Sequence, residues 1–168
     1  MREIFVKWNF PKPGYYKLNT DGASSNSSFA GIGGVVRDDV GSFVAGFAKF
    51  IYQNGSNVAE VWAAREGLLL AIQLGITKLE IECDSTYTVQ LCNGEVTPPW
   101  YLKALVQDIV DLKKRFEDLV FIHEYRESKK PSERILEGVW FNNPPVEIVN
   151  NLVADIQGVS YHKMIRVA

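Results

Sequence analysis

Three acidic residues, Asp21, Glu60 and Asp84, stand at positions where carboxylates could do chemistry. Asp21 closes the alternating segment Tyr16–Thr20 and precedes a glycine, although aspartate is a poor strand former and is costly to bury. Asp84 closes a second apolar segment in the same way. Carboxylates without a neighbouring His or Cys are hard oxygen ligands that suit Mg²⁺ or Mn²⁺. Such a cluster can hold two divalent ions for phosphodiester cleavage.

Each acid also has an ordinary structural explanation. Asp21 could begin a turn with Gly22, and Asp84 could cap a following helix. Glu60 could complement the dipole at a helix N-terminus, but that role requires no particular helix face. Glu60 shares its face with small or apolar residues, namely Ala63, Ala64, Gly67, Ala71 and Leu74. A glutamate on a packing face needs a partner or a cation, so this position favours a functional role.

The surrounding sequence predicts the elements that would carry these acids. Apolar and polar alternation predicts strands at Tyr16–Asp21, Gly31–Val36, Phe43–Phe50, Lys78–Asp84 and Leu119–Tyr125. Capping and stop signals predict helices at Val58–Leu74 and Ser85–Cys92. Amphipathic patterns predict two more, at Trp100–Phe116 and Val146–Gln157. The first helix has Asn57 as its expected N-cap and Gly75 as its expected stop signal. A meander followed by a helical crossover indicates a mixed sheet in an α/β domain.

Length and composition limit the class of protein. The chain has 168 residues, of which 46% are hydrophobic, and this suits a single globular domain. We expect no membrane span, because no apolar run approaches about 20 residues. We expect no signal peptide, because the N-terminal residues lack the apolar core and the cleavage site of one. With only Cys83 and Cys92, we expect no disulfide framework and an intracellular setting, in the nucleus or the cytoplasm. The net charge of −2 argues mildly against tight nucleic-acid binding, although acids at a metal site also lower the total.

Four motifs occur in an order that resembles the ribonuclease H fold. They are Thr20-Asp21-Gly22-Ala23-Ser24, Ala30–Asp38, Ala59-Glu60 with Ala63–Leu68, and Ile81–Ser85. More closely, the chain resembles plant ribonuclease H-like domains related to the reverse-transcriptase polyproteins of non-LTR retrotransposons. The lead-in with Trp8, Pro11 and Pro13-Gly14 is similar to that family, as is the tail from Pro144 to Ser160.

This resemblance implies an α/β domain whose five-stranded mixed sheet has the order 3-2-1-4-5, with helices on both faces. We expect an extended lead-in at residues 1–14, the ribonuclease H-like domain at 15–137, and a C-terminal extension with an amphipathic helix at 138–168.

The resemblance also implies a function, namely a metal-dependent endoribonuclease that cleaves the RNA strand of RNA/DNA hybrids with Mg²⁺ or Mn²⁺. Asp21 would bridge two metals, Glu60 would hold the metal on the leaving side, and Asp84 would hold the metal that carries the attacking water. The expected partner is an RNA/DNA hybrid, with no membrane contact and a monomeric domain. The alternative is a weakened or inactive domain that binds nucleic acid or a protein partner without turnover.

The segment after the last predicted strand departs from the family pattern. Tyr125-Arg126-Glu127 matches, but fewer residues than usual separate it from Trp140. Register from Tyr125 places Glu133 where the family has an aspartate, so Glu133 is the candidate fourth catalytic and metal-binding acid, with Glu137 as a second choice. A solvent-facing role for both acids is the alternative. Loss of a fourth ligand would weaken the second metal and lower the rate.

Residues close to the acids are candidates for binding nucleic acid. Those beside Asp21 and Asp84 are Gly22, Ala23, Ser24, Asn26 and Ser85, and those after the last predicted strand are Arg126, Lys129 and Lys130. Backbone amides, hydroxyls and basic side chains of this kind bond sugars and phosphates. A solvated basic cluster is the alternative for the second group. We expect His123 to be packed or hydrogen-bonded and not to be a catalytic base.

Overall fold

The structure is a computed structural model that describes residues 2–6, 8–24, 30–52, 55–124, 138–142 and 161–165. Its strands are β1 (Arg2–Val6), β2 (Tyr16–Ser24), β3 (Ala30–Arg37), β4 (Phe43–Ile51), β5 (Lys78–Cys83), β6 (Asp118–His123), β7 (Gly138–Phe141) and β8 (Tyr161–Ile165). Its helices are α1 (Ser56–Gln73), α2 (Thr86–Cys92) and α3 (Lys103–Lys113). In the part of the chain that the structure describes, no helix is long and apolar enough to cross a membrane.

The main sheet has six strands in the order β6-β5-β2-β3-β4-β7. β2 pairs with β5, and β5 with β6, in parallel, whereas β2–β3, β3–β4 and β4–β7 are antiparallel. The predicted strands one to five correspond to β2, β3, β4, β5 and β6, so the predicted order 3-2-1-4-5 is confirmed. β7 and the separate β1–β8 pair were not predicted, because strands of four or five residues carry little alternation to read.

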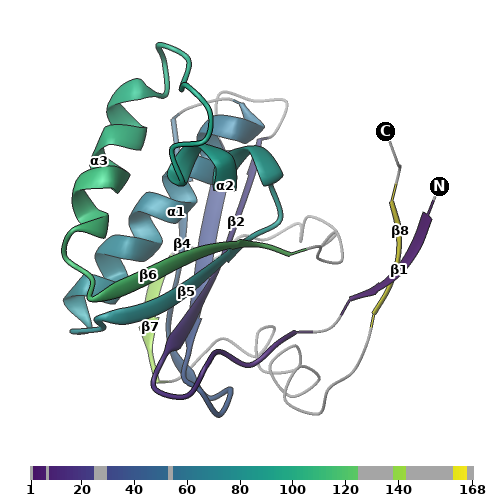
Figure 1. Ribbon diagram of the computed structural model, residues 1–168, viewed down its shortest axis with the longest axis vertical. Helices are drawn as coiled ribbons and strands as arrows, with labels where there is room; N and C mark the ends of the chain where they lie inside the picture. Colours follow the sequence, from purple (N-terminus) through teal and green to yellow (C-terminus); the bar gives the residue numbers. More distant parts are fainter. Residues whose placement is uncertain are drawn as a thin grey trace.

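The three described helices pack against one another and cover one face of the main sheet (Figure 1). The core lies between them and the sheet, and its fully buried side chains include Leu18, Val36, Leu68, Ile81 and Ile109. Along α1, Ala63, Ala64 and Ala71 are completely buried, so the small apolar face predicted for this helix does press on the sheet. Helices were predicted on both faces, but the described helices cover one face only, and the helix predicted at Val146–Gln157 lies outside the described residues.

Several predicted boundaries were wrong. α1 begins at Ser56, and its N-cap is Gly55 and not Asn57, because the Gly55 carbonyl accepts the first helical hydrogen bond, from Ala59. α3 begins at Lys103, after a turn in which the Leu102 amide donates to the Pro99 carbonyl. The predicted stop signal at Gly75 is confirmed by its left-handed φ of 75°.

Candidate metal centre

The three predicted acids come together at one point of the fold. One carboxylate oxygen from each of Asp21, Glu60 and Asp84 lies within 4.8 Å of the others. Asp21 and Asp84 are exposed, whereas Glu60 is only 7% exposed. If the acids only began a turn, capped a helix or complemented a helix dipole, they would not need to lie close together. Their convergence therefore favours a shared site.

Strand pairing brings Asp21 and Asp84 to the same edge of the sheet. β2 and β5 are parallel, and their backbone register ends at Asn19↔Glu82. Asp21 lies two residues beyond that pair, and Asp84 directly follows β5. Asp21 is inside β2 and not at its end, because β2 stays paired with β3 as far as Ser24. Pairing with β3 therefore holds the Asp21 backbone where the pairing with β5 has already stopped.

A close approach between β2 and α1 brings Glu60 to the same place. A Cβ atom built at Gly22 would lie 2.5 Å from the Ala59 carbonyl carbon and 2.7 Å from the Glu60 nitrogen. These are backbone atoms that cannot move aside without moving the first turn of α1. Sequence reasoning assigned Gly22 to a turn or a nucleic-acid contact, but its lack of a side chain is what allows α1 to reach β2.

The Glu60 carboxyl is in an environment that disfavours its charge. Burial, followed by the negative charges of Asp84 and Asp21, raises the pKa of Glu60 to about 8, and the hydrogen bond from the Gly22 backbone acts in the opposite direction. Its Oε2 atom is buried and has no hydrogen-bond partner among the described residues. A buried carboxylate oxygen without a partner, facing two more carboxylates, fits a bound cation.

The donor set identifies the kind of cation that fits. Among the described residues, the cluster contains carboxylate oxygens and neither nitrogen nor sulfur donors. Oxygen donors suit hard divalent ions such as Mg²⁺ or Mn²⁺. The residues present therefore fit a divalent cation, as expected from the sequence.

Asp84 does not cap a helix, and a histidine contacts its backbone carbonyl oxygen. Ser85 is the N-cap of α2, where its hydroxyl accepts a hydrogen bond from the Thr88 amide at 3.2 Å. The Nε2 atom of His123, at the end of β6, lies 3.2 Å from the Asp84 carbonyl oxygen. The prediction that His123 is hydrogen-bonded is thus confirmed, and its contact is with the backbone of a candidate ligand.

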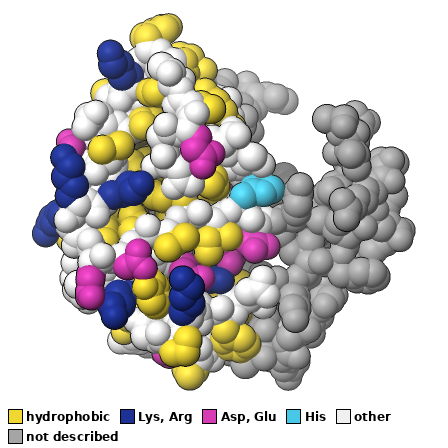
Figure 2. Space-filling view, viewed as in Figure 1, with side chains coloured by type: hydrophobic (Ala, Val, Ile, Leu, Met, Phe, Trp, Pro, Cys, Tyr) yellow, Lys and Arg dark blue, Asp and Glu magenta, His cyan; other side chains and the backbone are white. Residues whose placement is uncertain are grey.

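The other predicted site residues divide into two groups. Gly22 and Ser85 lie beside the acids, and Ala23 and Ser24 are described as the end of β2. Asn26, Arg126, Lys129, Lys130, Glu133 and Glu137 lie outside the described residues. On the face shown in Figure 2, Lys and Arg side chains of the described residues lie among Asp and Glu side chains, so neither sign dominates that view.

The comparisons with known proteins agree with this geometry. The reverse-transcriptase-like family matches residues 19–135. A provisionally named ribonuclease H protein of Arabidopsis thaliana is 31% identical over 129 residues, which are 76% of this chain and 21% of that protein. The chain therefore spans about a fifth of the length of that relative.

Two solved structures have the same fold. RNase H1 from the archaeon Halobacterium salinarum matches with a TM-score of 0.63 and 24% identity, over 67% of this chain and 86% of that one. LC11-RNase H1, isolated from compost and solved in complex with an RNA/DNA hybrid, matches with a TM-score of 0.60 and 28% identity, over 66% and 86%. Together with the family match, these similarities establish that the chain belongs to the reverse-transcriptase-like family of ribonuclease H-like domains.

Proposed function

We propose that this domain is a metal-dependent endoribonuclease that cleaves the RNA strand of RNA/DNA hybrids. The observation that carries the proposal is the cluster of Asp21, Glu60 and Asp84, whose carboxylate oxygens lie within 4.8 Å of one another. The substrate class is supported by LC11-RNase H1, a relative with 28% identity that was solved with an RNA/DNA hybrid.

In this proposal the chain's own part is to hold three carboxylates in a fixed arrangement. Asp21 and Asp84 are exposed and accessible to a phosphodiester, while Glu60 supports the site from its buried position. These residues would hold the divalent cations, with Glu133 proposed as a fourth ligand. When bound, such cations supply Lewis-acid stabilisation and activation of water. Preorganisation of the carboxylates matters because small displacements of catalytic groups have large effects on rate.

The test is cleavage of a hybrid labelled on either strand, in Mg²⁺, in Mn²⁺ and in EDTA. We expect the wild-type protein to cut the labelled RNA strand only, and only with metal. Asp21→Asn should lower the rate by at least about a hundredfold, because it removes a charged ligand from the centre of the site. The matched control is Asp111→Asn, an exposed aspartate on α3.

The variants also separate the proposal from its alternative. Equal cleavage by wild type and Asp21→Asn would contradict the proposed site. No cleavage by a folded wild-type protein that still binds the hybrid would favour the weakened, non-catalytic domain. Glu133→Gln assigns the fourth ligand, since a large loss of rate would place Glu133 in the site and an unchanged rate would show that three acids suffice.

A further inference from the structure

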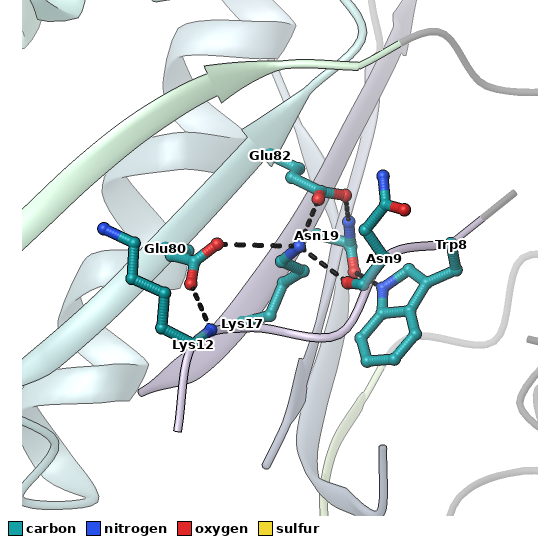
Figure 3. Close-up of polar contacts among 7 residues, drawn as sticks. All are labelled: Trp8, Asn9, Lys12, Lys17, Asn19, Glu80 and Glu82. Atoms are coloured by element: carbon teal, nitrogen blue, oxygen red, sulfur yellow. Dashed lines mark hydrogen bonds and ion pairs between the residues drawn. The ribbon is translucent and has the colours of Figure 1, made fainter. Parts of the chain in front are cut away.

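A buried polar network lies on the face of the sheet opposite the helices. It consists of Trp8, Lys17, Asn19, Glu80 and Glu82, and Figure 3 shows them converging from the lead-in, β2 and β5. Lys17 is 2% exposed and Glu82 is 3% exposed. Charged side chains are almost never buried to this degree unless they are paired. The function proposed above does not use any of these residues.

The centre of the network is a direct bond between β2 and β5, which we name the Asn19–Glu82 rung. The Asn19 Nδ2 atom donates to Glu82 Oε2 at 2.7 Å. The second oxygen of Glu82 lies 2.5 Å from Lys17 Nζ, and the side-chain oxygen Oδ1 of Asn19 accepts a hydrogen bond from Trp8 Nε1 at 2.9 Å. The three side chains that form the rung and its charge pair, Lys17, Asn19 and Glu82, are therefore each held by more than one polar contact.

The rung occupies the last point at which β2 and β5 are paired. Their register ends at Asn19↔Glu82, and each strand reaches a candidate metal ligand two residues later. Side chains two residues apart in a strand lie on the same face, so Asp21 lies on the same side of β2 as Asn19. Asp84 lies directly after the end of β5, two residues beyond Glu82. Beyond the rung, no further backbone pair between these two strands sets the separation of the acids.

The energetics favour a positional role over a stabilising one. Burying a Lys–Glu pair carries a desolvation cost that its mutual attraction often fails to repay. Replacing a buried ion pair with apolar residues of similar volume often leaves the free energy of unfolding unchanged or raises it. Buried ionic groups are better attested as devices that fix one arrangement. The two acids whose relative position would matter for metal binding, Asp21 and Asp84, lie two residues beyond the rung.

The lead-in residues close the network from solvent. Trp8 covers it and is only 9% exposed, with the Arg37 guanidinium carbon 4.6 Å from the centre of its ring. The Asn9 carbonyl oxygen accepts a hydrogen bond from Lys17 Nζ at 2.7 Å. Exclusion of water lowers the local dielectric and strengthens each polar contact beneath.

We propose that the Asn19–Glu82 rung is a positioning device that sets the separation of Asp21 and Asp84 for metal binding. The proposal rests on the proposed function, because it assumes that these acids bind a divalent cation. Lys17 neutralises the buried Glu82 charge, and Trp8 orients Asn19. In this way the lead-in contributes to a metal site that it does not itself touch.

The test compares Glu82→Gln with a matched control, Glu80→Gln. A glutamine has an NH2 donor in place of one carboxylate oxygen, so that a donor faces either Asn19 Nδ2 or Lys17 Nζ, and it carries no charge to pair with Lys17. Glu80 is also buried and lies on the same strand and face, where its oxygens contact the Lys12 amide at 2.7 Å and Lys17 at 3.7 Å. Its register partner is Lys17, two register positions further from the acids than the rung, so it does not form the rung. Asn19→Ala is the second rung variant and is used if Glu82→Gln does not fold.

Two measurements are made on proteins shown to be folded by circular dichroism. Calorimetric titration with Mn²⁺ alone should show roughly 10- to 100-fold weaker binding for the rung variant, and a change below about threefold for Glu80→Gln. Hydrogen exchange in EDTA should show faster exchange of the amides around Asp21 and Asp84 in the rung variant only. A variant that merely lowers stability would change neither quantity selectively.

The outcomes separate the two proposals. Wild-type Mn²⁺ affinity and wild-type exchange in the rung variant would overturn the positioning role, as would equal effects from Glu82→Gln and Glu80→Gln. Absence of Mn²⁺ binding by the wild-type protein would overturn the metal-dependent function. In that case the exchange data alone decide whether the rung fixes the two strand ends.

Discussion

At the scale of single residues, the Glu60 carboxyl is the group that most needs a cation. It is 7% exposed, it lies beside two further carboxylates, and one of its oxygens has no hydrogen-bond partner among the described residues. Each of these features costs free energy in the ionised, metal-free protein. A divalent cation offsets all three, since it supplies both the missing partner and the opposite charge. The metal-free protein should therefore carry a measurable penalty at this residue.

We expect that penalty to appear as a pH dependence of stability in EDTA. The folded-state pKa of Glu60, about 8, lies above its ordinary value of 4.5. Between these values the folded protein keeps a proton that the unfolded chain releases, so this group's contribution to stability is lost as the pH rises through the window. The loss should be roughly 2 kcal/mol, less than the full shift would give because Asp21 and Asp84 are solvent-exposed.

Urea unfolding of the wild type and Glu60→Gln across this pH window measures the effect. Glutamine does not titrate, so the free energy of unfolding of the variant should fall less steeply with pH, and at the alkaline end the variant should be the more stable protein. Addition of Mg²⁺ should stabilise the wild type and leave the variant nearly unchanged. If the free energy of unfolding depended on pH in the same way for both proteins in EDTA, Glu60 would not be in the buried, acidic environment described.

At the scale of elements, the contact between β2 and α1 assembles the site. Gly22 and Gly67 both allow the helix to lie close on the strand, but they meet different atoms. A Cβ at Gly22 would meet the backbone of Ala59 and Glu60, whereas one at Gly67 would lie 2.5 Å from a terminal carbon of the Leu18 side chain. Backbone cannot yield locally, while the end of a leucine can rotate.

These two glycines therefore give a matched pair of substitutions. Gly22→Ala should lower the free energy of unfolding by about 3 kcal/mol or more and weaken Mn²⁺ binding, because it displaces the turn that carries Glu60. Gly67→Ala should cost about 1 kcal/mol or less, since alanine gains helix propensity and Leu18 can move. Urea unfolding measures the stability of each variant, and Mn²⁺ titration measures its metal affinity. A Gly22→Ala protein with unchanged metal affinity would contradict the role assigned to this close approach.

The elements that position the acids were predictable because their patterns are local. Alternation in β2 and β5 and the small-residue face of α1 are visible in the sequence, and the crossover between parallel strands then brings Asp21 and Asp84 to one edge. Glu60 was predictable for the same reason, since a glutamate on a packing face is anomalous wherever the helix lies.

The polar network was not predictable by this route. Lys17, Asn19, Glu80 and Glu82 occupy the polar positions of alternating strands, which usually face solvent. They are buried because Trp8 and its neighbours cover them, and alternation contains no information about a covering segment from elsewhere in the chain. Trp8, an aromatic residue in the lead-in, was the only feature of the sequence that indicated a covering segment. The proposed fourth ligand, Glu133, lies outside the described residues and stays a prediction.

At the scale of the whole molecule, charge limits how the domain meets nucleic acid. The chain has a net charge of −2, and basic and acidic side chains are interspersed on the face in Figure 2. Binding of a hybrid then depends on a few local phosphate contacts and on cations at the acidic cluster. We expect modest affinity that is sensitive to salt.

The salt dependence of hybrid binding tests this expectation. For two or three phosphate contacts, raising monovalent salt fourfold should weaken binding by roughly 10- to 40-fold. Fluorescence anisotropy with a labelled hybrid measures the affinity, in EDTA and with the Asp21→Asn variant so that the hybrid stays intact. A labelled duplex analogue with an uncharged backbone is the control for non-electrostatic contacts. A salt slope near zero would mean that phosphate contacts contribute little.

In the proposed function, β2, α1 and β5 assemble a divalent-metal site from Asp21, Glu60 and Asp84. Anomalous diffraction from crystals of the protein grown with Mn²⁺ tests it most directly, because it locates the ion without reference to activity. We expect an anomalous peak bounded by the carboxylates of these three residues, and no such peak in crystals of Asp21→Asn. Mn²⁺ bound elsewhere, or three carboxylates that lie apart in the crystal, would contradict it.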